Sequence, residues 1–280
     1  MADRGERVEG RLAGVRGVQL HWQGVLPPDE PRGVVLLSHG LGEHAGRYGH
    51  VEDALVPEGW AVYALDHRGH GRSGGRRAHL DHYSDWLSDF DAFRHLVASR
   101  HVGLPLFVLG HSMGGQIALS YALEHGTGLA GIVLSSPALA SETATGPARQ
   151  VLQVLATVLP TARIVGLDTT KISKDPAVVA AYQADPLVYQ GKPTLAVMAA
   201  LASRFGVLQE RARGLDLPLL LQYAGKDALV DPTGSDLLAT TSGSSDLTVH
   251  RYDELWHEIY NEPERDRPLA DLREWFAARG

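Results

Sequence analysis

The stretch that decides the fold reads Leu106-Phe107-Val108-Leu109-Gly110-His111-Ser112-Met113-Gly114-Gly115. Its first residues are largely apolar, as in a strand that is buried on both faces of a sheet. After the glycines, apolar residues recur at helical spacing through residue 123, which predicts a helix. A strand, a sharp turn and a helix in this order hold the Ser112 hydroxyl exposed on a strained turn, as a nucleophilic serine requires.

The Gly-x-Ser-x-Gly pattern occurs twice in the chain, so the pattern alone does not identify the nucleophile. The second copy is Gly71-Arg72-Ser73-Gly74-Gly75. No strand runs directly into it, and two glycines followed by two arginines begin a helix poorly. Ser73 is therefore predicted to be a loop residue, and Ser112 is the predicted nucleophile.

Composition excludes several classes of function. With 280 residues the chain is long enough for one large α/β domain. Its net charge of −7 offers no basic surface for nucleic acid, and the absence of cysteine excludes disulfides and thiolate metal sites. The N-terminal residues lack the apolar core of a signal peptide, and no apolar stretch approaches a membrane span. We therefore expect a soluble protein, either cytoplasmic or peripherally associated with a membrane.

Apolar runs alternate with helical patterns along most of the chain. This alternation favours a mostly parallel sheet, whose ligands bind beyond the carboxyl ends of the strands. A hairpin of two antiparallel strands is expected at the start, around Gly14 and Gly17. The expected strands cover residues 7–12, 18–23, 34–38, 60–65, 106–111, 131–134, 217–223 and 247–252, and the expected helices cover residues 47–57, 83–100, 116–124 and 268–279.

Residues 137–216 interrupt this rhythm with helical and loop sequence that contains no convincing buried strand. The helices expected near residues 150–159 and 194–205 are notably apolar. They either pack on the sheet or form a cap over Ser112, with an inner face that receives an acyl chain and an outer face that touches lipid. The expected organisation is a single domain, with a core built from residues 1–136 and 217–280 and a cap insertion at residues 137–216.

The catalytic base is sought among the histidines that follow Ser112, because this fold orders its catalytic residues as serine, acid and histidine. A serine hydroxyl becomes a nucleophile only when an imidazole accepts its proton, and a carboxylate must orient that imidazole. His125 belongs to the end of the helix after Ser112, and His250 lies inside an expected strand. His257 lies in the loop beyond the carboxyl end of that strand and is the predicted base.

The same positional argument selects the catalytic acid. Asp216 precedes its strand and therefore sits at the wrong edge of the sheet. Asp227 lies just beyond the carboxyl end of that strand, and Asp231 follows closely. Because an aspartate before a proline is common in turns, Asp231 is the weaker candidate, and Asp227 is the predicted acid.

The tetrahedral intermediate also needs backbone donors for its oxyanion, one after the nucleophile and one in a loop after an earlier strand. These are the N–H groups of Met113 and Leu41. His39 is interpreted as a structural residue whose imidazole ties loops together. None of the 14 histidines forms a His-x-x-x-His pair on a credible helix with carboxylate support, so no metal and no other cofactor is expected.

Four motifs of the chain together resemble the monoacylglycerol lipase family of α/β-hydrolases. The elbow around Ser112 is shared with many hydrolases, but the Gly-Glu-His-x-Gly-Arg-Tyr run is much more specific. The likeness covers nearly the whole chain, the expected cap included. The motifs are His39-Gly40-Leu41-Gly42-Glu43-His44-Ala45-Gly46-Arg47-Tyr48, Asp66-His67-Arg68-Gly69-His70-Gly71-Arg72-Ser73, Gly110-His111-Ser112-Met113-Gly114-Gly115 and Tyr182-Gln183-Ala184-Asp185-Pro186-Leu187.

This resemblance implies an α/β-hydrolase fold with a mostly parallel sheet of the eight-stranded type, flanked by helices and covered by a helical cap. It implies a monoacylglycerol ester as substrate, transient contact of a U-shaped cap with membranes, and the same catalytic serine, acid and histidine. It also implies that Glu43, Arg47 and Tyr182 contact the glycerol head group. Some family members carry a second histidine three residues after the catalytic one, where this chain has Tyr260. A homodimer is left open.

The expected reaction is hydrolysis of a monoacylglycerol to fatty acid and glycerol through an acyl-enzyme on Ser112. Two enzymes with the same machinery are alternatives, a lysophospholipase and a carboxylesterase of broad specificity. The alternative from another class is a catalytically silent lipid-binding protein on the same scaffold. Rates on different glycerides and lysophospholipids separate the enzymes, and covalent capture of Ser112 separates an enzyme from a binding protein.

Overall fold

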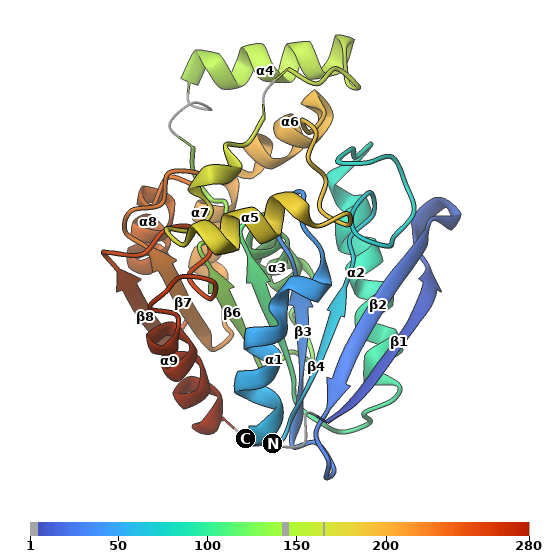
Figure 1. Cartoon of the computed structure of the whole chain (residues 1–280). Coiled ribbons are helices and arrows are strands. Elements are labelled where there is room, and N and C mark those ends of the chain that lie inside the picture. The colour runs from blue at the N-terminus through green and yellow to red at the C-terminus, as the bar shows by residue number, and fades with distance from the viewer. Residues whose placement is uncertain (1–4, 142–145, 165, 280) are drawn as a thin grey trace.

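The computed structural model describes residues 5–141, 146–164 and 166–279. Within these residues the strands form an eight-stranded sheet in the order β1-β2-β4-β3-β5-β6-β7-β8 (Figure 1). The strands are β1 (Glu6–Ala13), β2 (Gln19–Leu26), β3 (Gly33–Ser38), β4 (Trp60–Leu65), β5 (Leu106–His111), β6 (Gly131–Ser135), β7 (Leu219–Ala224) and β8 (Leu247–Tyr252).

The sheet is mostly parallel, which confirms the prediction from the sequence. β1 pairs antiparallel with β2, and β2 pairs antiparallel with β4, whereas all the other neighbours run parallel. The parallel strands therefore end at one edge, the upper edge in Figure 1, and the loops that follow them meet there. This is the edge at which the predicted catalytic residues were expected.

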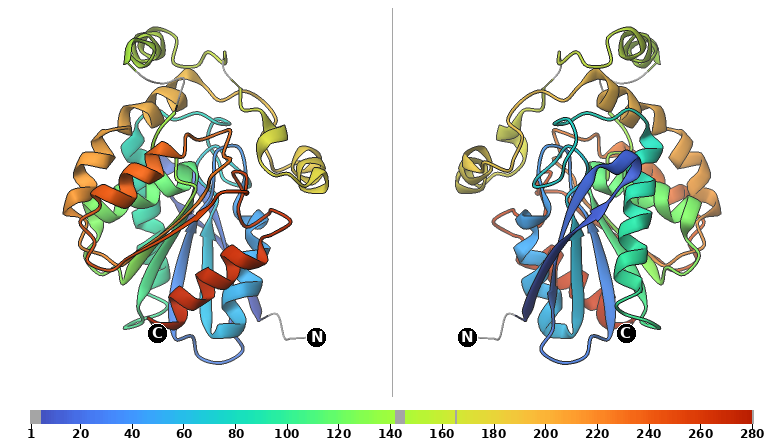
Figure 2. Two further views of the ribbon diagram at one scale, coloured as in Figure 1. Left: turned by 90° about the vertical axis from the view of Figure 1, so that its left-hand side faces the viewer. Right: turned by 90° about the vertical axis from the view of Figure 1, so that its right-hand side faces the viewer.

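Helices cover both faces of the sheet (Figure 2). One face carries α1 (Gly49–Leu55) and α9 (Asp266–Ala277), and the other carries α2 (Tyr83–Ala98), α3 (Met113–His125) and α8 (Thr233–Thr241). Strand β3 shows why both faces are apolar. Val34 and Leu36 belong to the core beneath α2 and α3, whereas Val35 and Leu37 belong to the core beneath α1 and α9. Since successive side chains of a strand point to opposite faces, a strand covered on both sides must be apolar throughout.

Some helix boundaries differ from the expected ones. The helix expected at residues 47–57 is a shorter α1 that lies between two 3₁₀ turns, Ala45–Tyr48 and Val56–Glu58. Pro57 in the second turn cannot donate a backbone hydrogen bond, which limits the α-helix there. Helix α8 was not predicted, because its sequence is dominated by threonine, serine, glycine and aspartate rather than by an apolar stripe.

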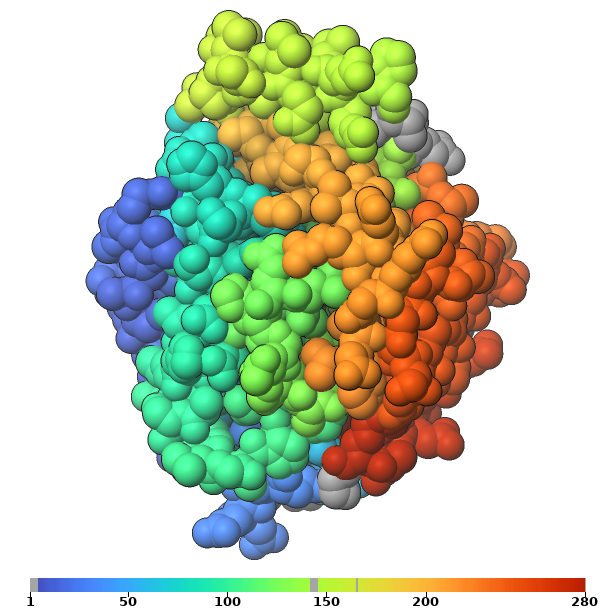
Figure 3. All heavy atoms as spheres, turned by 180° about the vertical axis from the view of Figure 1, so that it is seen from behind, coloured from blue at the N-terminus to red at the C-terminus, as the bar shows by residue number. Residues whose placement is uncertain are grey.

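The segment between β6 and β7 contains α4 (Gly146–Val158), α5 (Pro176–Ala184), α6 (Leu195–Arg204) and α7 (Val207–Arg211). Helix α6 packs into the core through Val197 and Leu201, as the packing interpretation expected. Helix α4 instead stands above α6, away from the sheet (Figures 1 and 2). A view from behind shows the segment around α4 as a separate layer on top of α6 (Figure 3). No helix in the described part of the chain has both the length and the apolar character needed to cross a membrane.

Candidate active site

Ser112 occupies a strained turn between β5 and α3. Its φ of 53° and ψ of −119° are unfavourable for any residue with a side chain, and such strain is typical of functional sites. The turn is fixed by the last residue of β6 and by the segment after it. The Ser112 N–H donates to the Ser135 carbonyl oxygen at 3.0 Å, and the Ser112 carbonyl accepts from the Ala138 N–H at 3.0 Å.

Glycines allow the backbones around this turn to approach one another closely. A Cβ atom on Gly114 would lie 2.0 Å from the Ser38 carbonyl oxygen, and a Cβ atom on Gly110 would lie 2.3 Å from the Gly114 carbonyl oxygen. Both separations are far below van der Waals contact, so no other residue fits at either position without moving backbone. The glycines thus place the first turn of α3 directly against the end of β3, from which the predicted oxyanion loop departs.

The structure brings His257 and Asp227 together at the same edge of the sheet. Asp227 follows β7, His257 follows β8, and the His257 Nδ1 atom lies 2.6 Å from the Asp227 Oδ2 atom. The other carboxylate oxygen, Oδ1, accepts the backbone N–H groups of Leu229 and Val230, each at 2.9 Å. These bonds fix the carboxylate, and the carboxylate in turn orients the imidazole. The alternative acid, Asp231, uses its Oδ1 atom to accept from the N–H and the hydroxyl of Thr233, as expected for a turn.

Burial and pairing have opposite effects on the protonation of this pair. Burial disfavours the charged imidazolium, but the Asp227 carboxylate and its hydrogen bond outweigh that cost and raise the pKa of His257 above its ordinary value. Burial likewise disfavours the charged Asp227, yet the attraction to His257 and the bonds from the two backbone N–H groups lower the pKa of Asp227. His257 is therefore a stronger base than an isolated histidine, and Asp227 remains a carboxylate.

The second Gly-x-Ser-x-Gly copy lies away from this constellation. Ser73 is a buried loop residue whose hydroxyl donates to the Asp66 carbonyl at 2.5 Å and accepts from the His21 N–H at 2.8 Å. Among the alternative bases, His250 stacks beside Tyr252 on β8, and His125 stacks on Tyr121 at the end of α3. Ser73, His125 and His250 are therefore not among the described residues that contact the Asp227 carboxylate, which are Leu229, Val230 and His257.

The loop after β3 is held in shape by its own polar groups. The His39 Nε2 atom accepts from the His67 N–H at 3.0 Å, so Nδ1 carries the proton and donates to the Gly40 carbonyl at 2.7 Å. The Gly40 N–H donates to Glu43 Oε1 at 2.6 Å. His39 therefore joins two loops, as the sequence suggested. Leu41, which follows Gly40, lines the same cavity as Met113, Ser112 and His257.

That cavity has a volume of about 490 Å³ and extends from Ser112 up beneath the segment that carries α4 and α6. Its size falls in the range of small-molecule binding sites. Most of its walls are apolar, and its polar residues include His111, which precedes Ser112, and Glu258, which follows His257. The apolar lining from the segment between β6 and β7 includes Ala148, Val151, Leu152, Leu155, Ile164, Leu167, Leu195, Met198, Leu201 and Phe205.

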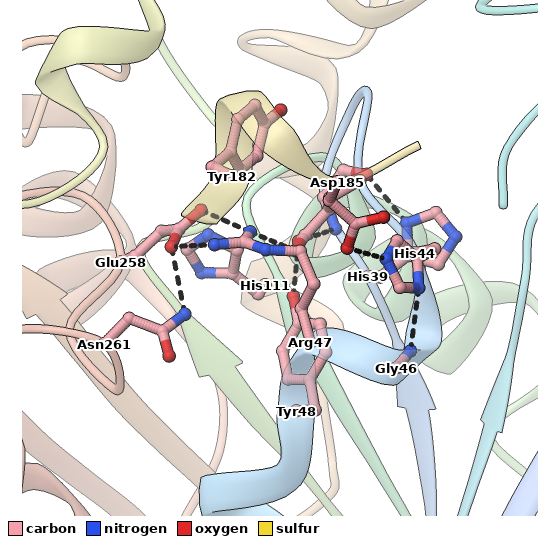
Figure 4. A network of polar contacts seen from close by, with 12 residues as sticks. His39, His44, Gly46, Arg47, Tyr48, His111, Tyr182, Asp185, Glu258 and Asn261 are labelled. Atoms are coloured by element: carbon pink, nitrogen blue, oxygen red, sulfur yellow. Dashed lines mark hydrogen bonds and ion pairs between the residues drawn. The ribbon is translucent and has the colours of Figure 1, made fainter. Parts of the chain in front are cut away.

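The three residues expected to contact the glycerol head group lie together in one network. Figure 4 shows two of them, Arg47 and Tyr182, beside Glu258. Arg47 Nη1 donates to Glu43 Oε2 at 2.7 Å, and the Arg47 guanidinium lies 4.5 Å from the centroid of the Tyr182 ring. Glu43 and Tyr182 line the cavity. Arg47 does not line the cavity. Its guanidinium also makes two bonds of 2.6 and 2.7 Å to the Glu258 carboxylate.

Sequence reasoning missed two polar residues of the cavity, His111 and Glu258. The His111 ring lies 4.7 Å from the His257 ring, and burial followed by the His257 charge lowers the pKa of His111 to about 3. His111 is thus a neutral side chain beside the base. Their positions in the sequence could have identified them, since His111 directly precedes the predicted nucleophile and Glu258 directly follows the predicted base.

Comparisons with known proteins place the chain in a family. The family described as "Serine aminopeptidase, S33" matches residues 29–264. A monoacylglycerol lipase from Mycolicibacterium smegmatis is 41% identical over 273 residues, which covers 97% of this chain and 98% of the relative.

Two solved structures extend the similarity to three dimensions. The monoacylglycerol lipase of Paleococcus ferrophilus has a TM-score of 0.81 at 28% identity, over 98% of this chain and 100% of the other. A soluble variant of the monoglyceride lipase of Saccharomyces cerevisiae, in complex with a substrate analogue, has a TM-score of 0.86 at 26% identity, over 96% and 94% of the two chains.

Proposed function

The chain belongs to the monoacylglycerol lipase family of α/β-hydrolases, and on that premise we propose that it hydrolyses monoacylglycerols to a fatty acid and glycerol. The observation that carries this proposal is that one apolar cavity is lined by a strained serine and by a histidine whose other ring nitrogen is paired with a buried aspartate. In this proposal Ser112 is the nucleophile, His257 is the base and Asp227 is the acid that orients the base.

In the first half of the reaction, Ser112 Oγ attacks the ester carbonyl carbon while His257 removes the hydroxyl proton. Asp227 stabilises the imidazolium that forms. The N–H groups of Leu41 and Met113 donate to the oxyanion, and the start of α3 adds the favourable end of its helix dipole. His257 then gives its proton to the departing glycerol oxygen, which leaves the acyl group bound to Ser112 as an ester.

In the second half, water takes the place of glycerol. His257 removes a proton from this water, the hydroxide attacks the acyl carbonyl, and the same N–H groups hold the second oxyanion. The proton returns to Ser112, and the free fatty acid leaves. The acyl chain occupies the apolar part of the cavity, because that part offers hydrocarbon walls and the Ser112 end offers polar groups.

The test of this function is a comparison of glycerides that share one acyl chain. We expect the protein to release oleic acid from monooleoylglycerol with a kcat/KM at least about 10-fold above that for dioleoylglycerol or trioleoylglycerol. The released acid is measured by chromatography, with all lipids presented in the same detergent micelles. Equal rates on all three glycerides would point to a carboxylesterase of broad specificity, and no release from any of them would contradict the proposed function.

We also propose that the segment around α4 contacts a membrane surface. Val154 and Val158 lie on one face of α4, are 64% and 71% exposed, and do not line the cavity. Exposed apolar side chains on one helix face are typical of interfacial contact. Replacing both with glutamate is expected to lower co-sedimentation with phosphatidylcholine vesicles about 10-fold and to preserve hydrolysis of a short soluble ester.

The matched control for this test is Val102→Glu, which changes an 85% exposed valine elsewhere on the surface. This variant is expected to bind vesicles as the unaltered protein does. Membrane contact through α4 is contradicted if the unaltered protein partitions equally with and without vesicles, or if the α4 variant still co-sediments fully.

A further inference from the structure

The polar end of the cavity is rich in hydrogen-bond acceptors and poor in positive charge. Glu43 and Glu258 both line the cavity, and both are buried, with 3% and 6% of their surface exposed. No lysine or arginine lies among the described residues of the cavity wall. His111 adds no charge, because burial keeps its pKa near 3. A head group that enters this end therefore meets two carboxylates directly.

Arg47 compensates only one of these two negative charges. Its Nη1 atom donates to Glu43 Oε2 at 2.7 Å and to Glu258 Oε1 at 2.6 Å, and its Nη2 atom donates to Glu258 Oε2 at 2.7 Å. The guanidinium is thus engaged by the protein itself and lies against the Tyr182 ring, outside the set of residues that line the cavity. Asp227 and His257 add no net positive charge here, because the Asp227 carboxylate offsets the charge of the imidazolium that forms in the reaction.

The hydrogen bonds of the two carboxylates leave acceptor capacity at two defined atoms. Glu43 Oε1 accepts from the Gly40 N–H and the Tyr48 hydroxyl, and Glu258 Oε2 accepts from Arg47 and from Asn261 Nδ2 at 2.9 Å. Glu43 Oε2 and Glu258 Oε1 each accept one bond among the described residues, both from Arg47 Nη1. Since a carboxylate oxygen can accept two bonds, each of these atoms retains one free lone pair.

The two oxygens with free lone pairs flank the same nitrogen atom. They therefore lie no farther apart than the sum of their two bonds to Arg47 Nη1, which is a span that the hydroxyls of a diol can bridge. The glycerol of a monoacylglycerol has two free hydroxyls and no charge. It can donate one hydrogen bond to each carboxylate, whereas a phosphate brings only acceptors and further negative charge.

From this arrangement we propose that Glu258, acting with Glu43, is a specificity-determining residue that accepts the two free hydroxyls of the alcohol and excludes esters whose alcohol carries a phosphate. The inference rests on the proposed ester hydrolysis at Ser112 and adds to it the residue that recognises the alcohol and the exclusion of a phosphate-bearing alcohol. It assigns the role of direct hydroxyl acceptor to Glu258, and it assigns to Arg47 the role of holding both carboxylates in place.

The experiment compares three octanoyl esters that differ only in the alcohol: 1-octanoylglycerol, ethyl octanoate and 1-octanoylglycerol 3-phosphate. For the unaltered protein we expect kcat/KM to be highest for 1-octanoylglycerol and at least about 100-fold lower for the phosphate ester, because like charges at close range repel strongly. Glu258→Gln is expected to raise kcat/KM for the phosphate ester about 10-fold and to lower it for 1-octanoylglycerol about 5-fold. The rate on ethyl octanoate is expected to change less than about 3-fold, since that alcohol makes no hydroxyl contact.

The matched control is Glu264→Gln, which removes a carboxylate that is 55% exposed and bonded to Lys174 outside the cavity. It is expected to preserve the order of the three esters. Thermal melting checks that each variant folds. If Glu258→Gln does not fold, Glu43→Gln removes the other cavity carboxylate and is expected to shift the ratio of phosphate ester to diol ester in the same direction.

Each of the following outcomes would overturn the proposal. The unaltered protein could hydrolyse the phosphate ester as fast as 1-octanoylglycerol. The folded carboxylate variants could leave the ratio of these two esters unchanged, or could slow all three esters equally, as a purely structural role predicts. Hydrolysis of ethyl octanoate without preference for the diol ester would remove the proposed specificity and leave ester hydrolysis intact, whereas no hydrolysis of any octanoyl ester would refute the proposed function as well.

Discussion

Replacing Ser112 with alanine is expected to lower kcat for ester hydrolysis by about 10⁵- to 10⁶-fold, because no other atom can form the acyl-enzyme at that position. The fold is expected to persist. The hydrogen bonds that fix the turn use the Ser112 backbone N–H and carbonyl, and alanine retains both groups. The measurement is the rate of fatty acid release from monooleoylglycerol, together with a thermal melting curve.

Ser73→Ala is the matched control, since Ser73 lies in the other copy of the same five-residue pattern. Its buried hydroxyl makes two hydrogen bonds within the loop, so we expect the melting temperature to fall. The kcat per folded molecule should change less than about 3-fold, because Ser73 does not line the cavity. A Ser112→Ala protein that keeps more than a tenth of the activity would refute the proposed mechanism.

Replacing Asp227 with asparagine is expected to lower kcat about 10⁴-fold. The amide can present an N–H to His257 Nδ1, which favours the wrong imidazole tautomer and moves the proton to the atom that should act as base. The loss of the carboxylate charge also lowers the pKa of His257, because Asp227 is what raises that pKa in the folded protein. The residual activity should therefore persist to lower pH than in the unaltered protein, as kcat/KM against pH will show.

The comparison for this variant is Asp231→Asn, which changes the neighbouring aspartate of the same loop. Asp231 bonds only to Thr233 in the contacts described above, and asparagine supports the same kind of turn. Its kcat is expected to change less than about 3-fold. If Asp231→Asn is the more damaging of the two substitutions, the assignment of the acid to Asp227 is wrong.

The central sheet and its catalytic edge could be predicted from the sequence for a local reason. Strands such as β3 and β5 are buried on both faces, so they form continuous apolar runs that are visible without knowledge of the fold. Parallel strands end at one edge, so the residues just beyond those ends can be expected to meet. The position of Asp227 after β7 and of His257 after β8 follows from this argument.

The carboxylate pair around Arg47 could not be predicted in the same way. Glu258 and Arg47 are separated by 211 residues, and their contact depends on how two loops fold against each other. Nothing in the sequence around Glu258 distinguishes this buried glutamate from a glutamate on the protein surface. The resemblance implied that Arg47 contacts the head group, but in the structure Arg47 bonds to two carboxylates that line the cavity and does not itself line it.

The position of α4 was also beyond the reach of sequence patterns. An apolar helix face predicts burial, and periodicity does not distinguish burial in a core from exposure above a cavity. Helix α5, in contrast, has a start signal that is readable in the sequence: Asp175 caps it by accepting from the Ala177 N–H, and Pro176 opens its first turn.

Covalent labelling with a fluorophosphonate, followed by mass spectrometry of the peptides, tests most directly the claim that Ser112 is the activated nucleophile of an ester hydrolase. We predict a single adduct on Ser112, no adduct on the Ser112→Ala protein and much slower labelling of the Asp227→Asn protein. A folded protein that stays unlabelled, or one that is labelled on another residue such as Ser73, would contradict the claim.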